Sequence, residues 1–446
     1  MQKQSSKSYS QSIKYWSSFA VAFLLRFKGL ILMGLFLGVV LFLVSNKIAP
    51  RFLSRSHSRI GVTGRYHPDE LPTYILEDIS DGLTVLSRDG VVEPNIAQSW
   101  ETPDKGKTWI FHLGESVEWQ DGTPLISEDI TYQFSDVLIE RPDDKTVVFK
   151  LNDAFSPFPS VLSRPIFKSG FLGTGEWRVV NVSLAGEFVQ NMTMEDDVGN
   201  RKTYKFFPSE DQAKLAYKMG YVDLLEYIID PKPIDTWNTV RFEEVVNKNQ
   251  VVTLFYNNDD QLFSANKELR QALNYAIDKG MLGERALSPI PPNSWVYNPQ
   301  VKPYDYNIER AKEIMGENIP DEQIKLVTTP VLLDVAEKIS EDWKALGIDS
   351  VVQVSSVIPT DYQVYLAILD VPKDPDQYSI WHSTQKESTN ISKFGNVRID
   401  KLLEDGRIEL DLEARRRIYI DFQRFIVEDL PAAFLYHPIT YNIHRK

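Results

Sequence analysis

The stretch Trp109–Phe134, WIFHLGESVEWQDGTPLISEDITYQF, decides how the whole chain is interpreted. Trp109–Leu113 predicts a strand, and Val117–Trp119 predicts a second, short strand. The Asp-Gly pair at 121–122 predicts a tight turn. A helix is predicted after it, with Ser127 placed to cap its first turn. This order of elements is common in proteins, but the combination of residues that forms it here is not.

The composition indicates a large folded protein. The chain has 446 residues, of which 43% are apolar and 12% aromatic. This length and apolar content predict two or three domains around sizeable cores. The chain has no cysteine, which excludes disulfides, Cys-ligated zinc or iron–sulfur sites and a lipid-modified cysteine anchor.

The charge is distributed unevenly along the chain. Ten lysines and arginines precede the first acidic residue, Asp69. The net charge of the whole chain is −13, so the residues from Asp69 onward carry a net charge of about −23. An acidic body argues against binding nucleic acid through its phosphates. Two interpretations stay open for this charge, namely solubility and attraction of cationic ligands.

An uncharged apolar run, 29–46, lies between Lys28 and Lys47. A helix of this length can cross a bilayer, whereas the core of a signal peptide is usually shorter and is followed by a cleavage motif of small residues. We therefore expect a single transmembrane anchor at 29–46, with a cleaved signal as the alternative. Residues 1–28 form a basic N-terminal segment, and the polar, basic residues 47–65 are expected to form a flexible stalk.

Several further segments share one resemblance. The run from Tyr66 to Trp100 ends in VVEPNIAQSW, SEDQAKLAYKMG precedes the strand VDLLEYI, and NKELRQALNYAIDKGML begins at Asn266. Together with Trp109–Phe134, and in this order, they resemble the extracytoplasmic solute-binding proteins of the peptide/nickel importer family. The resemblance extends from about Tyr66 to His444. Such proteins bind small ligands outside a membrane and deliver them to an ABC-type permease.

The resemblance implies an α/β fold of two lobes, like the periplasmic binding proteins with their Venus-flytrap architecture. Lobe I is expected to comprise residues 66–253 and 431–446, and lobe II residues 254–430. A β-α-β unit at 324–355 fits this architecture, since such a crossover joins parallel strands. After Val137 the long helical excursion of larger members is missing, so we expect a trimmed side domain. Closure about a hinge would then enclose the ligand.

The predicted ligand site starts from a carboxylate. In YLAILDVPKDPDQYSIWHS, Asp370 ends an apolar strand before a proline-rich turn. The resemblance implies that Asp370 pairs with the α-ammonium group of a peptide. The alternative is that Asp370, Asp374 and Asp376 only shape a turn.

Five other residues are candidates for the walls of the cleft. Trp381 follows the acidic turn, Tyr256 and Asn257 end the predicted hinge strand, Tyr74 lies on the opening segment and Trp119 lies beside the Asp-Gly turn. Plain packing is an alternative for each of them. The six histidines are scattered, so neither a metal nor a cofactor is predicted.

The expected function is that of a monomeric, membrane-tethered binding protein of an ABC importer, which captures peptides or similar small solutes. Its body would be extracytoplasmic and its partner would be the permease. A sensor that keeps the fold without transport, or a binder of a nickel chelate or haem, is the alternative. An enzyme is not expected, because no G-x-S-x-G, H-E-x-x-H or cysteine nucleophile occurs. The stretch GTGEWRVVNVS is interpreted as a structural turn rather than a phosphate loop.

Overall fold

The structure, a computed structural model, describes residues 19, 22, 25–47, 56–264, 266–317 and 319–446. Most of the predicted segment 1–28 and residues 48–55 of the predicted stalk lie outside these residues. The chain divides into two compact units. One comprises residues up to His57 together with 195–202, and the other comprises Ser58–Met194 and Thr203–Lys446.

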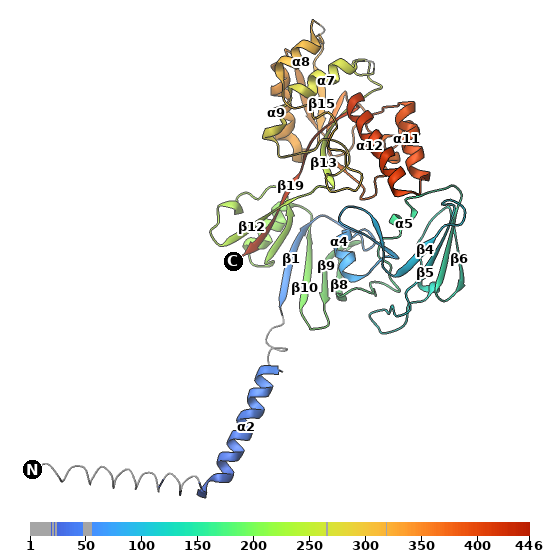
Figure 1. The fold of residues 1–446 in the computed structure, drawn as a ribbon. Coiled ribbons are helices and arrows are strands. Elements are labelled where there is room, and N and C mark those ends of the chain that lie inside the picture. The colour runs from blue at the N-terminus through green and yellow to red at the C-terminus, as the bar shows by residue number, and fades with distance from the viewer. Residues whose placement is uncertain (1–18, 20–21, 23–24, 48–55, 265, 318) are drawn as a thin grey trace, which may run out of the picture. The chain divides into compact units, whose positions relative to one another are not determined.

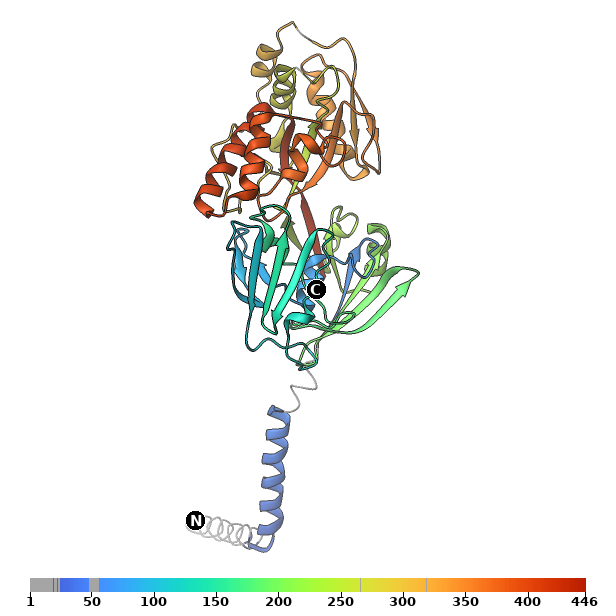
Figure 2. The same ribbon diagram turned by 90° about the vertical axis from the view of Figure 1, so that its right-hand side faces the viewer.

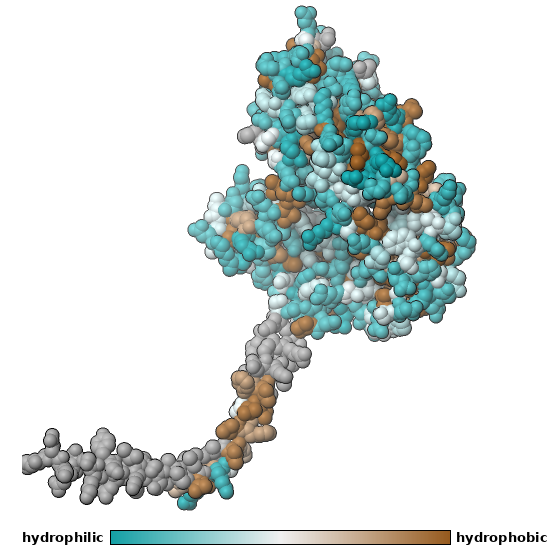
Figure 3. Space-filling model, in the orientation of Figure 1, coloured by the Kyte–Doolittle hydropathy of each residue, from teal (hydrophilic) through white to brown (hydrophobic). Residues whose placement is uncertain are grey.

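The first unit contains helix α2 (Lys28–Lys47), which is 20 residues long. Large apolar side chains of this helix are exposed, those of Leu30, Phe36 and Phe42 among them. Figure 3 shows hydrophobic residues along the helix. Among the described residues, no helix has both the length and the hydropathy that a membrane crossing requires. The transmembrane helix expected at 29–46 is therefore not supported. In the same unit, Asp196 accepts hydrogen bonds from the backbone N–H groups of Val198, Gly199 and Asn200.

The second unit consists of two lobes (Figure 1, Figure 2). Lobe I is built on a seven-stranded sheet. Phe206 and Phe207 belong to different apolar clusters, one with helix α4 (Thr73–Ile79) and one with helix α6 (Glu210–Lys218). Because neighbouring strand residues point to opposite faces, the two helices pack on opposite sides of the sheet. In sheet order the strands are β12 (Val240–Val246), β19 (Ile439–Arg445), β11 (Leu224–Ile228), β1 (His57–Thr63), β10 (Arg201–Phe207), β9 (Phe188–Glu195) and β8 (Arg178–Ala185).

A smaller, four-stranded sheet belongs to the same lobe and carries the stretch Trp109–Phe134. Its strands are β4 (Ala97–Glu101), β5 (Thr108–Leu113), β7 (Thr146–Leu151) and β6 (Val137–Asp143), with the pair β2 (Thr84–Leu86) and β3 (Val92–Pro94) and the short helix α5 (Phe158–Val161) beside them. The strand predicted at Trp109–Leu113 is confirmed. Val117–Trp119 forms no strand, only the isolated bridge Glu118–Pro124.

The helix predicted after Ser127 is also wrong, because only a 3₁₀ turn, Ser127–Asp129, forms there. The guanidinium of Arg141 donates to the carbonyl oxygens of Ser127 and Ile130 at 2.9 and 2.6 Å. A helix would need these acceptors for its own backbone hydrogen bonds. The arginine thus ends the helix after one turn.

Lobe II is built on a six-stranded sheet. The predicted β-α-β unit is confirmed, since β15 (Ile324–Thr328) and β16 (Ser350–Val354) pair in parallel across helix α9 (Leu333–Lys344). The other strands are β14 (Glu284–Arg285), β18 (Ala432–His437), β13 (Gln250–Tyr256) and β17 (Val364–Asp370). The other α-helices described in this lobe are α7 (Lys267–Ala276), α8 (Ile308–Met315), α10 (Tyr378–Trp381), α11 (Val397–Ile408) and α12 (Leu412–Asp429).

The chain passes between the two sheets at 247–249 and at Pro438. Strands β13 and β18 both lie in the sheet of lobe II, so the division expected at 253/254 falls inside β13 and that at 430/431 falls just before β18. The two crossings are joined, because the N–H of Asn247 donates to the carbonyl of Pro438 at 2.9 Å. Two adjacent crossings are the arrangement that a hinge needs.

A candidate ligand-binding cleft between the lobes

One cavity of the body has walls from both lobes and from the crossings. Its volume is about 700 Å³, within the range of small-ligand sites. We call it the hinge cleft. Its walls include Tyr66, Tyr74, Glu226 and Tyr227 of lobe I, Asn293 and Ile368 of lobe II, and residues 245–250, which contain the crossing 247–249.

The wall from lobe I is aromatic and acidic. The rings of Tyr74 and Tyr227 lie 5.2 Å apart between centroids, and the hydroxyl of Tyr66 donates to the carbonyl of Thr63 at 3.0 Å. Burial raises the pKa of Tyr74, and the carboxylate of Glu226 raises it further. The tyrosine is therefore neutral at physiological pH. Its hydroxyl is buried and has no hydrogen-bond partner within the described part of the chain.

A second cavity, of about 420 Å³, adjoins the hinge cleft and shares Lys248, Asn249 and Asn293 with it. It adds the basic side chains of Arg88 and Lys373. The second cavity thus has two basic side chains that the hinge cleft lacks, together with the acidic residue Asp89.

The lobes touch each other beside these cavities. The backbone N–H of Trp295 donates to the carbonyl of Asp89 at 2.9 Å, and the amide of Asn293 donates to the carbonyl of Arg88 at 2.8 Å. On the side-sheet flank, the N–H of Ser156 donates to the carbonyl of Arg407 at 2.6 Å. These contacts describe a body whose lobes are closed on one another.

Two of the predicted site residues lie at or next to the hinge cleft. Tyr74 lines it directly. Asp370 is exposed at the end of β17 and accepts a hydrogen bond from the amide of Gln250, a lining residue, at 2.7 Å. Asn257 instead donates to the carbonyl of Tyr362 at 2.8 Å and holds a loop of lobe II.

The other three predicted residues lie in the cores. Trp119 and Trp381 are 2% and 0% exposed, and their indole N–H groups donate to Asp129 and Gln377 respectively. Tyr256 is also 0% exposed and belongs to the core of lobe II. The structure therefore does not bring these residues together with Tyr74 and Asp370.

Tyr74 is the one predicted site residue that lines the hinge cleft, and the other lining residues, Tyr66, Glu226 and Tyr227 among them, were not predicted. A signal for Glu226 is present in the sequence, because this acid stands inside the otherwise apolar strand segment LLEYI. A charged residue within such a strand often has a functional reason to be there.

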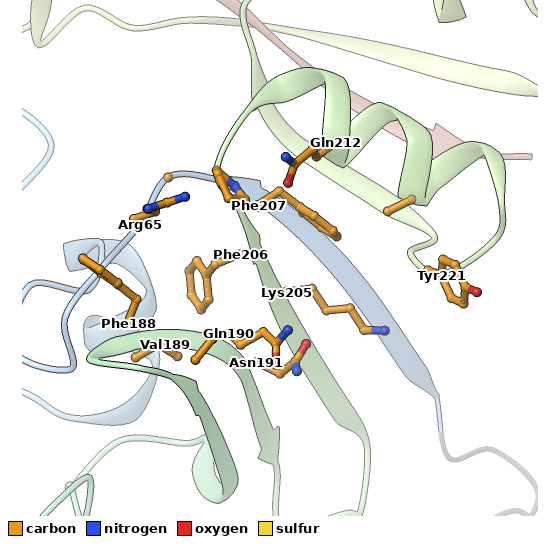
Figure 4. Close-up of a pocket in the computed structure, with 14 residues that line it drawn as sticks. Arg65, Phe188, Val189, Gln190, Asn191, Lys205, Phe206, Phe207, Gln212 and Tyr221 are labelled. Carbon is orange, nitrogen blue, oxygen red and sulfur yellow. The ribbon is translucent and has the colours of Figure 1, made fainter.

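Another cavity, of about 660 Å³, lies on lobe I alone (Figure 4). Arg65 lies 5.9 Å from the ring centroid of Phe188, and Lys205 lies 5.9 Å from that of Tyr221. Because every lining residue belongs to lobe I, closure of the lobes does not change its walls. The hinge cleft is therefore the better candidate for a ligand site that closure completes.

The hinge contains a histidine that should make stability depend on pH. Burial lowers the pKa of His437 below its usual 6.5, and its Nδ1 lies 2.8 Å from the carbonyl oxygen of Gln250. Because the pKa of His437 is lower in the folded than in the unfolded state, its neutral ring stabilises the fold fully above pH 6.5. This contribution is lost as the pH falls through the pKa of the folded state. We expect the loss of Tm between about pH 8 and about pH 5 to be smaller in His437→Gln than in the parent. His112→Gln serves as the control, and equal pH profiles for the parent and His437→Gln would contradict the assignment.

Comparison with known proteins places the chain in a family. Residues 91–389 match the model of the bacterial extracellular solute-binding proteins, family 5. The probable D,D-dipeptide-binding periplasmic protein DdpA of Escherichia coli is 25% identical over 418 residues, which cover 77% of this chain and 78% of DdpA. The chain therefore belongs to the family 5 solute-binding proteins, a family of extracellular proteins.

Two solved structures show the same two-lobe fold. The oligopeptide-binding protein AppA of Bacillus subtilis, in complex with a nonapeptide, has a TM-score of 0.68 at 20% identity, covering 88% of this chain and 95% of that one. NikZ of Campylobacter jejuni, in complex with Ni(L-His), has a TM-score of 0.71 at 19% identity, covering 87% and 94%. One fold thus holds ligands of different chemistry.

Proposed function

We propose that the chain is the substrate-binding protein of an ABC importer and captures peptides in the hinge cleft by closure of the two lobes. The observation that carries this proposal is a cavity with walls from both lobes, placed against two adjacent crossings. A ligand in such a cavity stabilises the closed state by its greater affinity for that state. Binding without catalysis is proposed, in keeping with the family.

Peptides are the proposed ligand class because the hinge cleft provides both the size and the polar groups that a short peptide needs. Its volume is about 700 Å³, and it presents a carboxylate, tyrosines and amides. A closed cleft excludes water, so every polar group of the ligand needs such a partner. DdpA and AppA, by their names, bind peptides.

The proposal is tested by calorimetry and thermal shift of the purified protein with pools of di- to pentapeptides. We expect heat and a raised Tm with at least one pool. A chelate of nickel with histidine and haem are measured in parallel, since NikZ binds Ni(L-His). If one of these compounds binds and no peptide does, peptides are the wrong ligand class and that compound takes their place. If none of the compounds gives a response, the proposal is overturned.

We also propose that the protein works as a monomer held at the membrane, with the body outside and a permease as its partner. Attachment is supported by the exposed apolar side chains along α2. Membrane fractions washed with carbonate should retain the full chain and release a variant that starts at Ser56. Growth on the bound peptide as sole amino-acid source tests transport. Binding without uptake would favour the alternative, a sensor that uses the same fold.

A further inference from the structure

The cavity on lobe I has no part in the function proposed above. We call it the lobe I cavity. Its volume of about 660 Å³ falls within the range of small-ligand sites. It shares no lining residue with the hinge cleft, and all of its walls belong to one lobe (Figure 4). A ligand bound there would therefore be held whether the lobes are open or closed.

The lobe I cavity is positively charged. Among the described residues that line it, the charged ones are Arg65 and Lys205, and both are basic. Neither forms an ion pair with an acid in the described part of the chain. The acids that adjoin lining residues in the sequence, Glu187 and Asp211, are exposed and do not line the cavity. In a protein with a net charge of −13, this leaves a local positive potential that attracts anions.

One end of the cavity is formed by Arg65 and Phe188 (Figure 4). The N–H of Gly64 donates to the carbonyl of the last residue of β10 at 2.8 Å, and the N–H of Val189 donates to the carbonyl of Tyr66 at 2.9 Å. The backbone of Arg65 is therefore held from both sides. Its guanidinium carbon lies 5.9 Å from the ring centroid of Phe188, a distance at which the ring face attracts a cation.

The opposite end is formed by Lys205 and Tyr221 (Figure 4). The ammonium nitrogen of Lys205 lies 5.9 Å from the ring centroid of Tyr221. Helix α6 ends just before this tyrosine, at Gly220, whose φ of +76° is typical of a helix end. The N–H of Tyr221 then donates to the carbonyl of Ala216 at 2.9 Å. The helix end thus fixes the second pair of a cation and an aromatic ring.

The middle of the cavity is apolar and has amides on its sides. Phe207 lies between the two ends, and Gln190 and Gln212 lie on either side of it (Figure 4). Neither glutamine side chain makes a hydrogen bond to another residue in the described part of the chain. A hydrocarbon segment would be removed from water against the phenylalanine, and the amides would provide hydrogen-bond partners for polar ligand atoms nearby.

We propose that the lobe I cavity binds a small organic diacid, with a carboxylate at each end of a short apolar segment. One carboxylate lies against the guanidinium of Arg65, the other lies against the ammonium group of Lys205, and the apolar segment lies on Phe207. Both cations are engaged at once, so the second contact is intramolecular and adds to the affinity without a second loss of translational freedom. This site is additional to peptide capture and does not depend on it.

The first test is calorimetry of the purified full chain with succinate, glutarate, adipate, pimelate and suberate. Each diacid is compared with the linear monoacid that has the same number of carbons. We expect the affinity to pass through a maximum as the diacid lengthens, where its span matches the two cations. The best diacid should bind roughly tenfold more tightly than its monoacid. If no diacid binds, or if the monoacids bind equally well, the proposal is overturned.

The second test replaces the two cations one at a time. Arg65→Gln and Lys205→Gln should each weaken binding of the best diacid roughly tenfold, as the loss of a charged hydrogen bond does. Lys218→Gln is the matched control, because Lys218 also belongs to lobe I and lies 5.7 Å from the ring centroid of Trp237, outside the cavity. It should stay within about twofold of the parent.

Charge-conserving variants separate the loss of a cation from damage to the fold. Arg65→Lys and Lys205→Arg should retain most of the affinity for the diacid, because each keeps a cation at its end of the cavity. Unchanged binding in both glutamine variants would overturn the proposal, as would equal losses in the glutamine and the charge-conserving variants.

Peptide titrations distinguish this proposal from the proposed function. With the diacid at saturation, the affinity for peptide should stay within about twofold, because the two cavities share no lining residue. If the protein binds the diacid through Arg65 and Lys205 but binds no peptide, peptide capture is rejected and the lobe I cavity is supported. If a peptide displaces the diacid, the diacid binds in the hinge cleft and the proposal is overturned.

Discussion

Replacement of Gly90 by alanine should lower the affinity for ligand at least about tenfold while leaving both lobes folded. Gly90 lies in the β2–β3 turn with a φ of +89°, and a Cβ added there would lie 2.5 Å from the carbonyl oxygen of Lys373 in lobe II. This contact exists only where the lobes are closed on each other. The added methyl group therefore destabilises the closed state, which is the state that holds the ligand.

Gly122→Ala is the matched control for this variant. Gly122 has a φ of +78°, so it carries the same penalty for a left-handed alanine, but a Cβ there would meet nothing within 4 Å. Calorimetry measures the affinity of each variant, and small-angle scattering measures closure in the presence of ligand. Equal losses of affinity in the two variants would show that strain in the turn, and not contact between the lobes, is responsible.

Asp374→Asn is expected to lower the free energy of unfolding by about 3–5 kcal/mol. Asp374 and Arg415 form a bidentate ion pair at 2.6 and 2.9 Å, with side chains only 10% and 6% exposed. Without the carboxylate, the guanidinium stays buried with no countercharge. Urea unfolding of the full chain measures the change, and a loss under about 1 kcal/mol would contradict the interpretation.

Asp376→Asn gives the comparison for this pair. Asp376 pairs with Arg407 at 3.0 Å, but that arginine is 32% exposed and retains water when its partner is neutral. Burial also raises the pKa of Asp376, so its charge is already disfavoured in the folded state. We expect a loss of about 1 kcal/mol or less.

Much of the fold could be predicted because local signals and tertiary structure agree. Helices α6, α7 and α8 begin directly after Ser209, Asn266 and Asn307, and in each case that side chain accepts a hydrogen bond from the backbone N–H three residues on. Such caps depend only on residues that are close together in the sequence, so the sequence alone can predict them.

The failures depend on residues that the local pattern does not include. Arg141, on the following strand, occupies the carbonyl groups that the helix after Ser127 would have used. Of the residues in the hinge cleft, Tyr74 could be predicted from the sequence because it lies on the opening segment. Glu226 and Tyr227 line the same wall because the register of β11 against β19 shifts next to them. The residue pattern of β11 does not predict this shift.

The position of β19 affects the order in which the lobes can be completed during synthesis. This strand lies between β11 and the edge strand β12 in the large sheet of lobe I, yet it follows every strand of lobe II along the chain. Lobe II therefore has all its strands while lobe I still has a gap, and a nascent chain that lacks residues 439–445 should keep lobe I open to proteases. Limited proteolysis of chains arrested before residue 439 would show this as early cleavage in lobe I and protection of lobe II. Because lobe I is completed late, a secretion machinery would have more time to move the chain across a membrane before the chain is fully folded.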